Sequence, residues 1–117
     1  MKPILPSQLC NTVAIALGSG YRFIAAEAIL YCEADGNYTH IHLDDGQRLT
    51  TTKSIKQILG ILSPDEFVRI HHSYVVNLEH VHRLLVEPEP QVELRNGSRI
   101  QVSRRKKKDL LDHYLIL

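Results

Sequence analysis

The chain has 117 residues, of which 44% are hydrophobic and 23% are charged. This length allows one modest core and excludes two ordinary domains, and the composition excludes an intrinsically disordered chain. The formal net charge of +1 excludes a uniformly basic surface, so any affinity for nucleic acid must come from local clusters of charge.

In chain order, residues 1–11, with Pro3 and Pro6, are expected to be a lead-in or the remnant of a linker, and residues 12–117 a single domain. Short apolar or alternating segments, rich in β-branched residues and cut by turns about every ten residues, indicate a mainly β domain. The predicted strands are residues 12–17, 21–24, 29–33, 38–43, 48–51, 67–70, 81–87, 91–94 and 99–102. Residues 18–20, 35–37, 44–46 and 96–97 offer the Gly, Asn or Asp that tight turns need, and the acidic, proline-containing segment 87–90 predicts another reversal.

Two segments predict helices, one short and internal and one C-terminal. Ser54 can cap the internal helix, which should end before Pro64, and Ser103 can cap the C-terminal helix. The positions expected to face inward are Ile55, Ile58, Leu59 and Leu62 in the first helix and Leu110, Leu111, Tyr114 and Leu115 in the second.

The most informative segment is FVRIHHSYVVN at residues 67–77, because it places a polar cluster between two apolar runs. A short hairpin needs fewer donors and acceptors than this for its own closure. The polar residues are Arg69, His71, His72, Ser73 and Tyr74. This excess predicts contact with something outside the fold.

Two other segments accompany it in a fixed order: CEADGNYTHIHL at residues 32–43 and IQVSRRKKKDLL at residues 100–111. Together, E-x-D-G-N-Y, R-I-H-x-S-Y-V-V-N and V-S-R-R at these separations resemble the LytTR family over residues 12–115. The resemblance implies the DNA-binding domain of a bacterial transcriptional regulator, of the kind found in response regulators of two-component systems. It also implies an elongated, mainly β fold of small, stacked antiparallel sheets, whose loops on one side enter major grooves.

Base edges are recognised by planar or bifunctional groups, whereas phosphates are bound by cations, hydroxyls and backbone donors. With the resemblance, the candidates for base contacts are Asn37, Tyr38, His72 and Arg105, the last suited to the O6 and N7 of guanine. The candidates for contacts to the DNA backbone are Lys53, Lys56, Ser73, Ser103, Arg104, Lys106 and Lys107.

Structural alternatives remain for several of these residues. Asn37 can serve only its turn, and Tyr38 can simply pack. His71 and Asn77 are better interpreted as hydrogen-bonded structural residues than as contacts. Family members often carry Asn or Arg where this chain has His72, which leaves the preferred base open.

The basic run at residues 104–108 can be a solvated helix start, but cations in a first helical turn oppose the helix dipole, and an external anion would relieve that conflict. Acidic residues cluster elsewhere in the sequence, so we expect the charge to be segregated. These acids are Asp44, Asp45, Glu87, Glu89 and Glu93.

The sequence gives little support for a metal site, a bound cofactor or a catalytic function. Cys10 and Cys32 lack a CxxC spacing, so neither a disulfide framework nor a zinc site is indicated, and Cys32 is expected to be a reduced core thiol. The pairs His40/His42 and His80/His82 could each face one side of a strand, but no third ligand has a recognisable spacing. No nucleophile motif, phosphate-binding glycine loop or pair of catalytic carboxylates occurs, so we expect no enzyme and no cofactor.

The sequence therefore predicts a sequence-specific DNA-binding module whose partner is double-stranded DNA with direct repeats in promoters. We expect a monomer or weak dimer off DNA and two protomers on it. The alternative is a stand-alone interaction or anti-activator module that modulates another regulator. Family members commonly carry a receiver or other sensory domain, which is absent here, so that domain was trimmed or the chain acts alone. No apolar run approaches the ~20 residues that cross a bilayer, and no signal peptide is evident, so we expect a cytoplasmic protein without a membrane partner.

Overall fold

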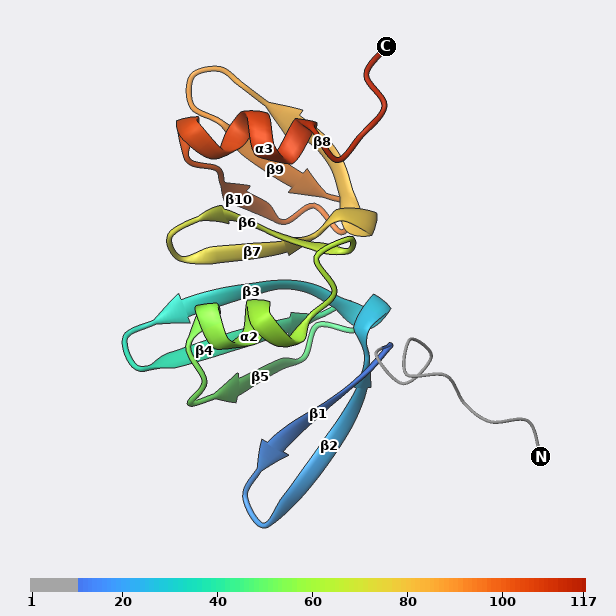
Figure 1. Cartoon of the computed structure of the whole chain (residues 1–117), viewed down its shortest axis with the longest axis vertical. Helices are drawn as coiled ribbons and strands as arrows, with labels where there is room; N and C mark the ends of the chain where they lie inside the picture. The colour runs from blue at the N-terminus through green and yellow to red at the C-terminus, as the bar shows by residue number, and fades with distance from the viewer. Residues whose placement is uncertain (1–10) are drawn as a thin grey trace, which may run out of the picture.

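A computed structural model describes residues 11–117 as three antiparallel sheets stacked along the longest axis, with principal extents of 49 × 36 × 24 Å (Figure 1). Residues 1–10 of the expected lead-in at residues 1–11 lie outside the described residues. The strand orders are β1-β2, β5-β4-β3-β7-β6 and β10-β9-β8. The mainly β class and the stack of small antiparallel sheets are confirmed.

The elements follow one another in a simple order along the chain. They are β1 (Thr12–Leu17), β2 (Gly20–Ala25), the 3-10 turn η1 (Ala26–Ala28), β3 (Ile29–Asp35), β4 (Tyr38–Leu43), β5 (Arg48–Thr51), α2 (Ile55–Ile61), β6 (Phe67–His71), β7 (Tyr74–Asn77), η2 (Leu78–His80), β8 (Val81–Leu85), β9 (Gln91–Leu94), β10 (Arg99–Gln101), η3 (Arg104–Lys106) and α3 (Lys107–Leu111). All nine predicted strands are present, with ends that shift by one or two residues. Strand β7 was not predicted.

Strand β7 escaped prediction because it lacks alternation. Val75 and Val76 are both fully buried, one on each face of the five-stranded sheet, so the strand shows no polar face. The tight turns did follow the sequence. Gly36 takes φ +58° and Gly97 takes φ +93°, values that a side chain would disfavour.

Helix α2 forms as predicted. The Ser54 hydroxyl accepts a hydrogen bond from the backbone N–H of Gln57, and the Ser54 N–H donates to the Gln57 side-chain oxygen, which completes a capping box. Ile55, Ile58 and Leu62 are buried.

The prediction for the C-terminal helix was wrong in two respects. Ser103 makes no side-chain cap, because the helix opens with the 3-10 turn η3. The α-helix then ends at Leu111, so Leu115 is 99% exposed rather than packed inward. Leu110 is buried, and the Tyr114 hydroxyl donates to the Leu78 carbonyl at 2.9 Å.

The five-stranded sheet separates two hydrophobic clusters. The first core, between this sheet, α2 and the β1–β2 hairpin, contains Ile15, Ile24, Ala26, Ile29, Cys32, Ile41, Leu43, Leu49, Ile55, Ile58, Leu62, Phe67 and Val75. The second core, between this sheet, the three-stranded sheet and α3, contains Leu30, Ile70, Val76, Val92, Leu94, Ile100, Val102 and Leu110. A register shift between Ile29 and Tyr31 lets the neighbours Leu30 and Tyr31 both face the second core, whereas Ile29 and Cys32 face the first.

Two buried residues behave as the sequence predicted. Asn77 is almost fully buried, and its amide donates to the Ile29 carbonyl at 2.9 Å while its oxygen accepts from the Glu79 N–H at 3.0 Å. It therefore ties the end of β7 to the start of β3. Cys32 is a free, buried thiol whose pKa burial raises to about 12. No helix among residues 11–117 is long and apolar enough to cross a membrane.

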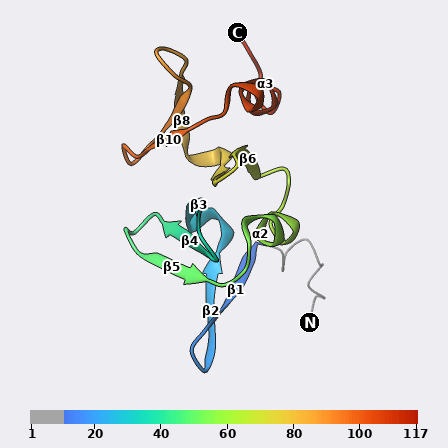
Figure 2. The ribbon, with the colours of Figure 1, turned by 90° about the vertical axis from the view of Figure 1, so that its left-hand side faces the viewer.

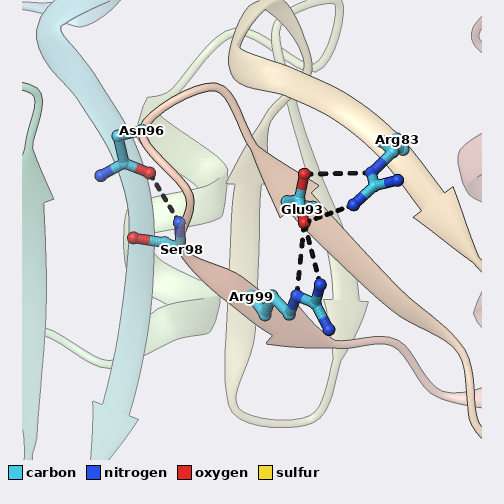
Figure 3. Close-up of polar contacts among 5 residues, drawn as sticks. All are labelled: Arg83, Glu93, Asn96, Ser98 and Arg99. Carbon is cyan, nitrogen blue, oxygen red and sulfur yellow. Dashed lines mark hydrogen bonds and ion pairs between the residues drawn. The ribbon is translucent and has the colours of Figure 1, made fainter.

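Glu93 ties the strands of the three-stranded sheet together on its outer face (Figure 3). Its carboxylate accepts from Arg83 Nε at 3.0 Å and Arg83 Nη2 at 2.9 Å, and from Arg99 Nε at 3.3 Å. Arg83 and Arg99 lie directly opposite Glu93 in the two flanking strands. These contacts are forked and charge-assisted, which makes their geometry specific even at an exposed site.

We predict that Glu93→Gln will flatten the acid side of the stability profile. Hydrogen bonding to Arg83 lowers the pKa of Glu93 below its usual 4.5. A carboxyl with a lowered folded-state pKa stabilises the fold above its unfolded pKa, and this contribution disappears as pH falls through the folded value. Urea unfolding between pH 7 and pH 3 measures the effect. The control is Glu87→Gln, which removes an exposed carboxylate; the two variants giving the same profile would contradict the role assigned to Glu93.

Candidate nucleic-acid interface

Four connections between strands and helices lie on one edge of the molecule, at the left of Figure 1; Figure 2 turns this edge toward the viewer. They are the β3–β4 turn, the β5–α2 link, the β6–β7 turn and the link from β10 into η3. We call residues 35–38, 52–54, 71–74 and 102–106 the loop edge. All three sequence motifs therefore reach the same side of the fold.

Hydrogen bonds join neighbouring parts of the loop edge to one another. The Ala34 N–H donates to the Ser73 carbonyl at 2.8 Å, which links the β3–β4 hairpin to the β6–β7 turn. The Ser103 N–H donates to the Ile70 carbonyl at 2.8 Å, which links the third motif to the second. The hydroxyl of buried Thr39 donates to the Lys53 carbonyl at 2.7 Å. The loop edge is thus one connected surface rather than four independent loops.

The β3–β4 turn presents Asn37 and Tyr38, both exposed, beside Gly36 at its first central position. His40 fixes the base of this hairpin. Its Nε2 lies 2.9 Å from the Asp35 carboxylate and its Nδ1 lies 2.9 Å from the Thr50 hydroxyl, so the imidazole bridges β3 and β5 across β4. Tyr38 does not pack into either core, which removes the structural alternative for that residue.

The β6–β7 turn leaves His72 exposed and uses the Arg69 and His71 side chains for its own shape. Arg69 donates from Nε to the His71 carbonyl at 3.3 Å and from Nη2 to the His72 carbonyl at 2.5 Å. The Ser73 N–H donates to His71 Nδ1 at 3.1 Å, which makes His71 a structural residue, as expected. The His71 and His72 rings lie 4.2 Å apart between centroids.

The third motif places Ser103, Arg104 and Arg105 at the start of η3, with both arginines exposed. Neither arginine has an ion-pair partner among residues 11–117. Lys106 lies 3.7 Å from the Asp109 carboxylate, an exposed pair that costs little to break. Lys53 and Lys56 are exposed on the β5–α2 link and the first turn of α2.

The expected segregation of charge is only partly correct. Asp44 and Asp45 lie in the β4–β5 turn, at the opposite end of β4 from the loop edge. Glu87 and Glu89, however, border two small clefts that Arg104 also lines. The acidic β8–β9 loop therefore adjoins the basic run. The sequence does not show at which edge of the fold this loop lies, so this proximity was not predicted.

Three of the four paired histidines contact other parts of the fold, and His80 lies in η2 rather than on a strand with His82. His40 and His42 contact Asp35 and Glu33 through Nε2, at 2.9 and 3.1 Å, and His42 stacks on Tyr31 with centroids 4.1 Å apart. His80 Nε2 lies 2.6 Å from the Glu27 carbonyl. Within the described part of the chain, no group of three or more His, Cys, Asp or Glu could hold a metal ion.

Sequence reasoning missed three residues that shape the loop edge: Thr39, His40 and Arg69. Thr39 and His40 contact groups of other segments, and such partners follow from the strand pairing rather than from any local motif. Arg69 contacts carbonyls of its own turn. The sequence shows a threonine hydroxyl between Tyr38 and His40, but it does not show that this hydroxyl is buried or which group it bonds. The structure places all eleven predicted contact residues on or next to the loop edge.

Comparison with known proteins is consistent with this geometry. Residues 19–114 match the family described as the LytTr DNA-binding domain. The chain is 34% identical over 80 residues to the CO-responsive transcriptional regulator RcoM of Rhodospirillum rubrum, an alignment that covers 68% of this chain and 33% of that protein. The chain therefore spans about a third of that relative's length.

A solved LytTr DNA-binding domain from Bacillus cereus superposes with a TM-score of 0.76 at 21% identity, covering 88% of this chain and 95% of that one. This likeness shows a shared fold. It accounts for the stack of small sheets that the three motifs predicted.

In the free domain, we predict that the His71 ring titrates below its usual pKa of 6.5, because burial, then the neighbouring His72 and Arg69, disfavour the imidazolium. A lowered histidine pKa means that stability falls as pH drops below about 6.5, since the unfolded chain takes up the proton first. NMR of the ring nitrogens against pH measures this, with His71→Asn to assign the signals. A pKa of 6.5 or above, or a proton on Nδ1 of the neutral ring, would contradict the bond from Ser73.

Proposed function

This chain belongs to the LytTr DNA-binding domain family, and we propose that it recognises promoter sequences by placing its loop edge in major grooves of double-stranded DNA. The observation that carries the proposal is that four polar and cationic segments share one edge and are joined by hydrogen bonds. A rigid edge suits recognition because base contacts require side chains held in fixed positions relative to the phosphates.

The residues divide into two roles. The residues that would contact bases are Asn37, Tyr38, His72 and Arg105. Their side chains are exposed and contribute little to the fold. The proposed contacts to phosphates come from Lys53, Lys56, Ser73, Ser103, Arg104, Lys106 and Lys107. A domain of net charge +1 could bind DNA in this way because these cations lie on or next to the loop edge.

We propose that two protomers occupy two direct repeats of a short element. The isolated domain would be monomeric or weakly dimeric, since α2 and α3 are too short to build a coiled coil. The chain would serve as the output module of a transcriptional regulator. RcoM is about three times as long as the matched region, which fits a regulator in which another domain receives the signal. By its name, the signal for RcoM is CO.

A second function, as a module that contacts another protein, is favoured by one feature. Tyr21 and Phe23 are 70% and 71% exposed on the same outer face of the β1–β2 hairpin. Exposed aromatic pairs of this kind occur at protein interfaces. Salt-dependent affinity for one DNA sequence over random DNA would establish the first function; its absence, with retained binding of a partner protein, would establish the second.

We predict that sequences selected from random duplex DNA will contain paired direct repeats, and that the domain will protect both and bend the DNA between them. Footprinting and gel mobility of phased fragments measure these two effects. A fragment in which one repeat is scrambled is the control. A single repeat bound as tightly as the pair, without a bend, would refute the two-protomer arrangement.

Arg105→Ala and His72→Ala should each cost about 1–3 kcal/mol on the selected site and relax selectivity at particular base pairs. Lys107→Ala should instead weaken specific and random DNA about equally, and the slope of log affinity against log salt should become shallower by roughly one. The control is Arg48→Ala, an exposed arginine at the start of β5 and away from the loop edge. If Arg105→Ala weakened both kinds of DNA equally, its assignment to a base edge would be wrong.

A further inference from the structure

An open cavity of about 560 Å³ lies between β1, the first-core face of the five-stranded sheet and α2. Most of its wall is aliphatic. Buried Cys32 and Ile41 line it from the sheet, Ile15 from β1 and Ile58 from α2, while Ile61 is 60% exposed at its rim. This volume falls within the range of about 300–1,000 Å³ that small-molecule sites occupy. None of the DNA-contact roles proposed above uses the apolar part of this cavity.

The polar part of the lining is confined to one short run and one strand end. Thr51, Thr52 and Lys53 come from the end of β5 and the link to α2, and Thr12 from the start of β1. Lys53 is exposed, and no carboxylate lies within 4.0 Å of its ammonium group among residues 11–117. An apolar cavity whose charged lining residue is an unpaired cation is complementary to a molecule with an aliphatic body and an anionic head.

We propose that this cavity binds a small aliphatic carboxylate, with its chain against Ile15, Ile41 and Ile58 and its carboxylate at Lys53. Aliphatic walls contribute affinity in proportion to the apolar surface they cover, and the lysine with its neighbouring threonine hydroxyls orients the head group. A cationic ligand would find no Asp or Glu to pair with among the described residues that line the cavity.

The site also connects to the loop edge. The Lys53 carbonyl accepts the hydroxyl of Thr39, and its N–H donates to the Thr51 hydroxyl at 3.2 Å, so the backbone of Lys53 is held between β4 and β5. A carboxylate bound to the Lys53 ammonium would remove one cation from those facing phosphates. This consequence rests on the proposed function: an occupied cavity should weaken DNA binding.

Direct binding tests the site without DNA. Octanoate, nonanoate and decanoate, each below the concentration at which it forms micelles, would be titrated into the full chain by calorimetry and by NMR of the isoleucine methyl groups. We expect one molecule per chain, shifts centred on Ile15, Ile41, Ile58 and Ile61, and affinity rising about fourfold per added methylene. Decanol should bind up to about fivefold more weakly than decanoate, because it cannot pair with Lys53.

Two variants and one matched control locate the site. Lys53→Gln should make decanoate and decanol bind equally, and Ile61→Asp should weaken decanoate by repelling its head group at the rim. Lys56→Gln changes a neighbouring exposed lysine that does not line the cavity, and it should leave both affinities unchanged. Absent or unsaturable binding, equal binding of acid and alcohol by the unaltered chain, or binding that appears only after residues 1–10 are deleted would each overturn the proposal.

The DNA arm is a separate measurement. Decanoate should weaken binding of the selected site by the unaltered chain and have no effect on Lys53→Gln. Saturable decanoate binding without any effect on DNA would retain the site and refute its coupling to Lys53. Failure of the chain to bind specific DNA at all would refute the proposed function, while the direct titration would still decide whether the cavity is a site.

Discussion

The pairing of β3 with β7 is the constraint on which the rest of the fold depends. These two central strands have no solvent-facing side along much of their length, because each contributes residues to both hydrophobic cores. Cys32 and Val75 lie opposite each other and enter the first core, whereas Val76 enters the second. A one-residue slip in this register would exchange the two faces, so each side chain would enter the core that is packed around the other set.

The same pairing carries the proposed function. Strand β3 ends at the first motif and β7 begins at the second, and the Ala34–Ser73 bond extends the contact between them to the turns. The bond from Ser103 to Ile70 then adds the third motif. The positions of the proposed contact residues therefore follow from the same backbone hydrogen bonds that order the sheet, so a chain with little net charge can still gather cations along one edge.

Much of this was predictable from the sequence, for identifiable reasons. The sequences of β4 and β5 alternate, and the ends of both strands were located to the residue; Ser54 and Gln57 mark the start of α2. Strand β7 was hidden because burial on both faces erases alternation. The C-terminal helix was overestimated because Leu115 continues an apolar pattern that no neighbouring element covers. The three motifs indicated the loops, but the carbonyls that join them and the approach of Glu87 and Glu89 to Arg104 depend on long-range pairing.

The central claim is that four segments act as one DNA-contacting surface. Amide hydrogen exchange of the domain with and without its selected duplex tests it directly. The account predicts added protection at residues 35–38, 52–54, 71–74 and 102–106 together, at the same DNA concentration, and none in the β4–β5 turn or the β1–β2 hairpin. Protection confined to one segment, or centred on the exposed aromatic face of the β1–β2 hairpin, would contradict it.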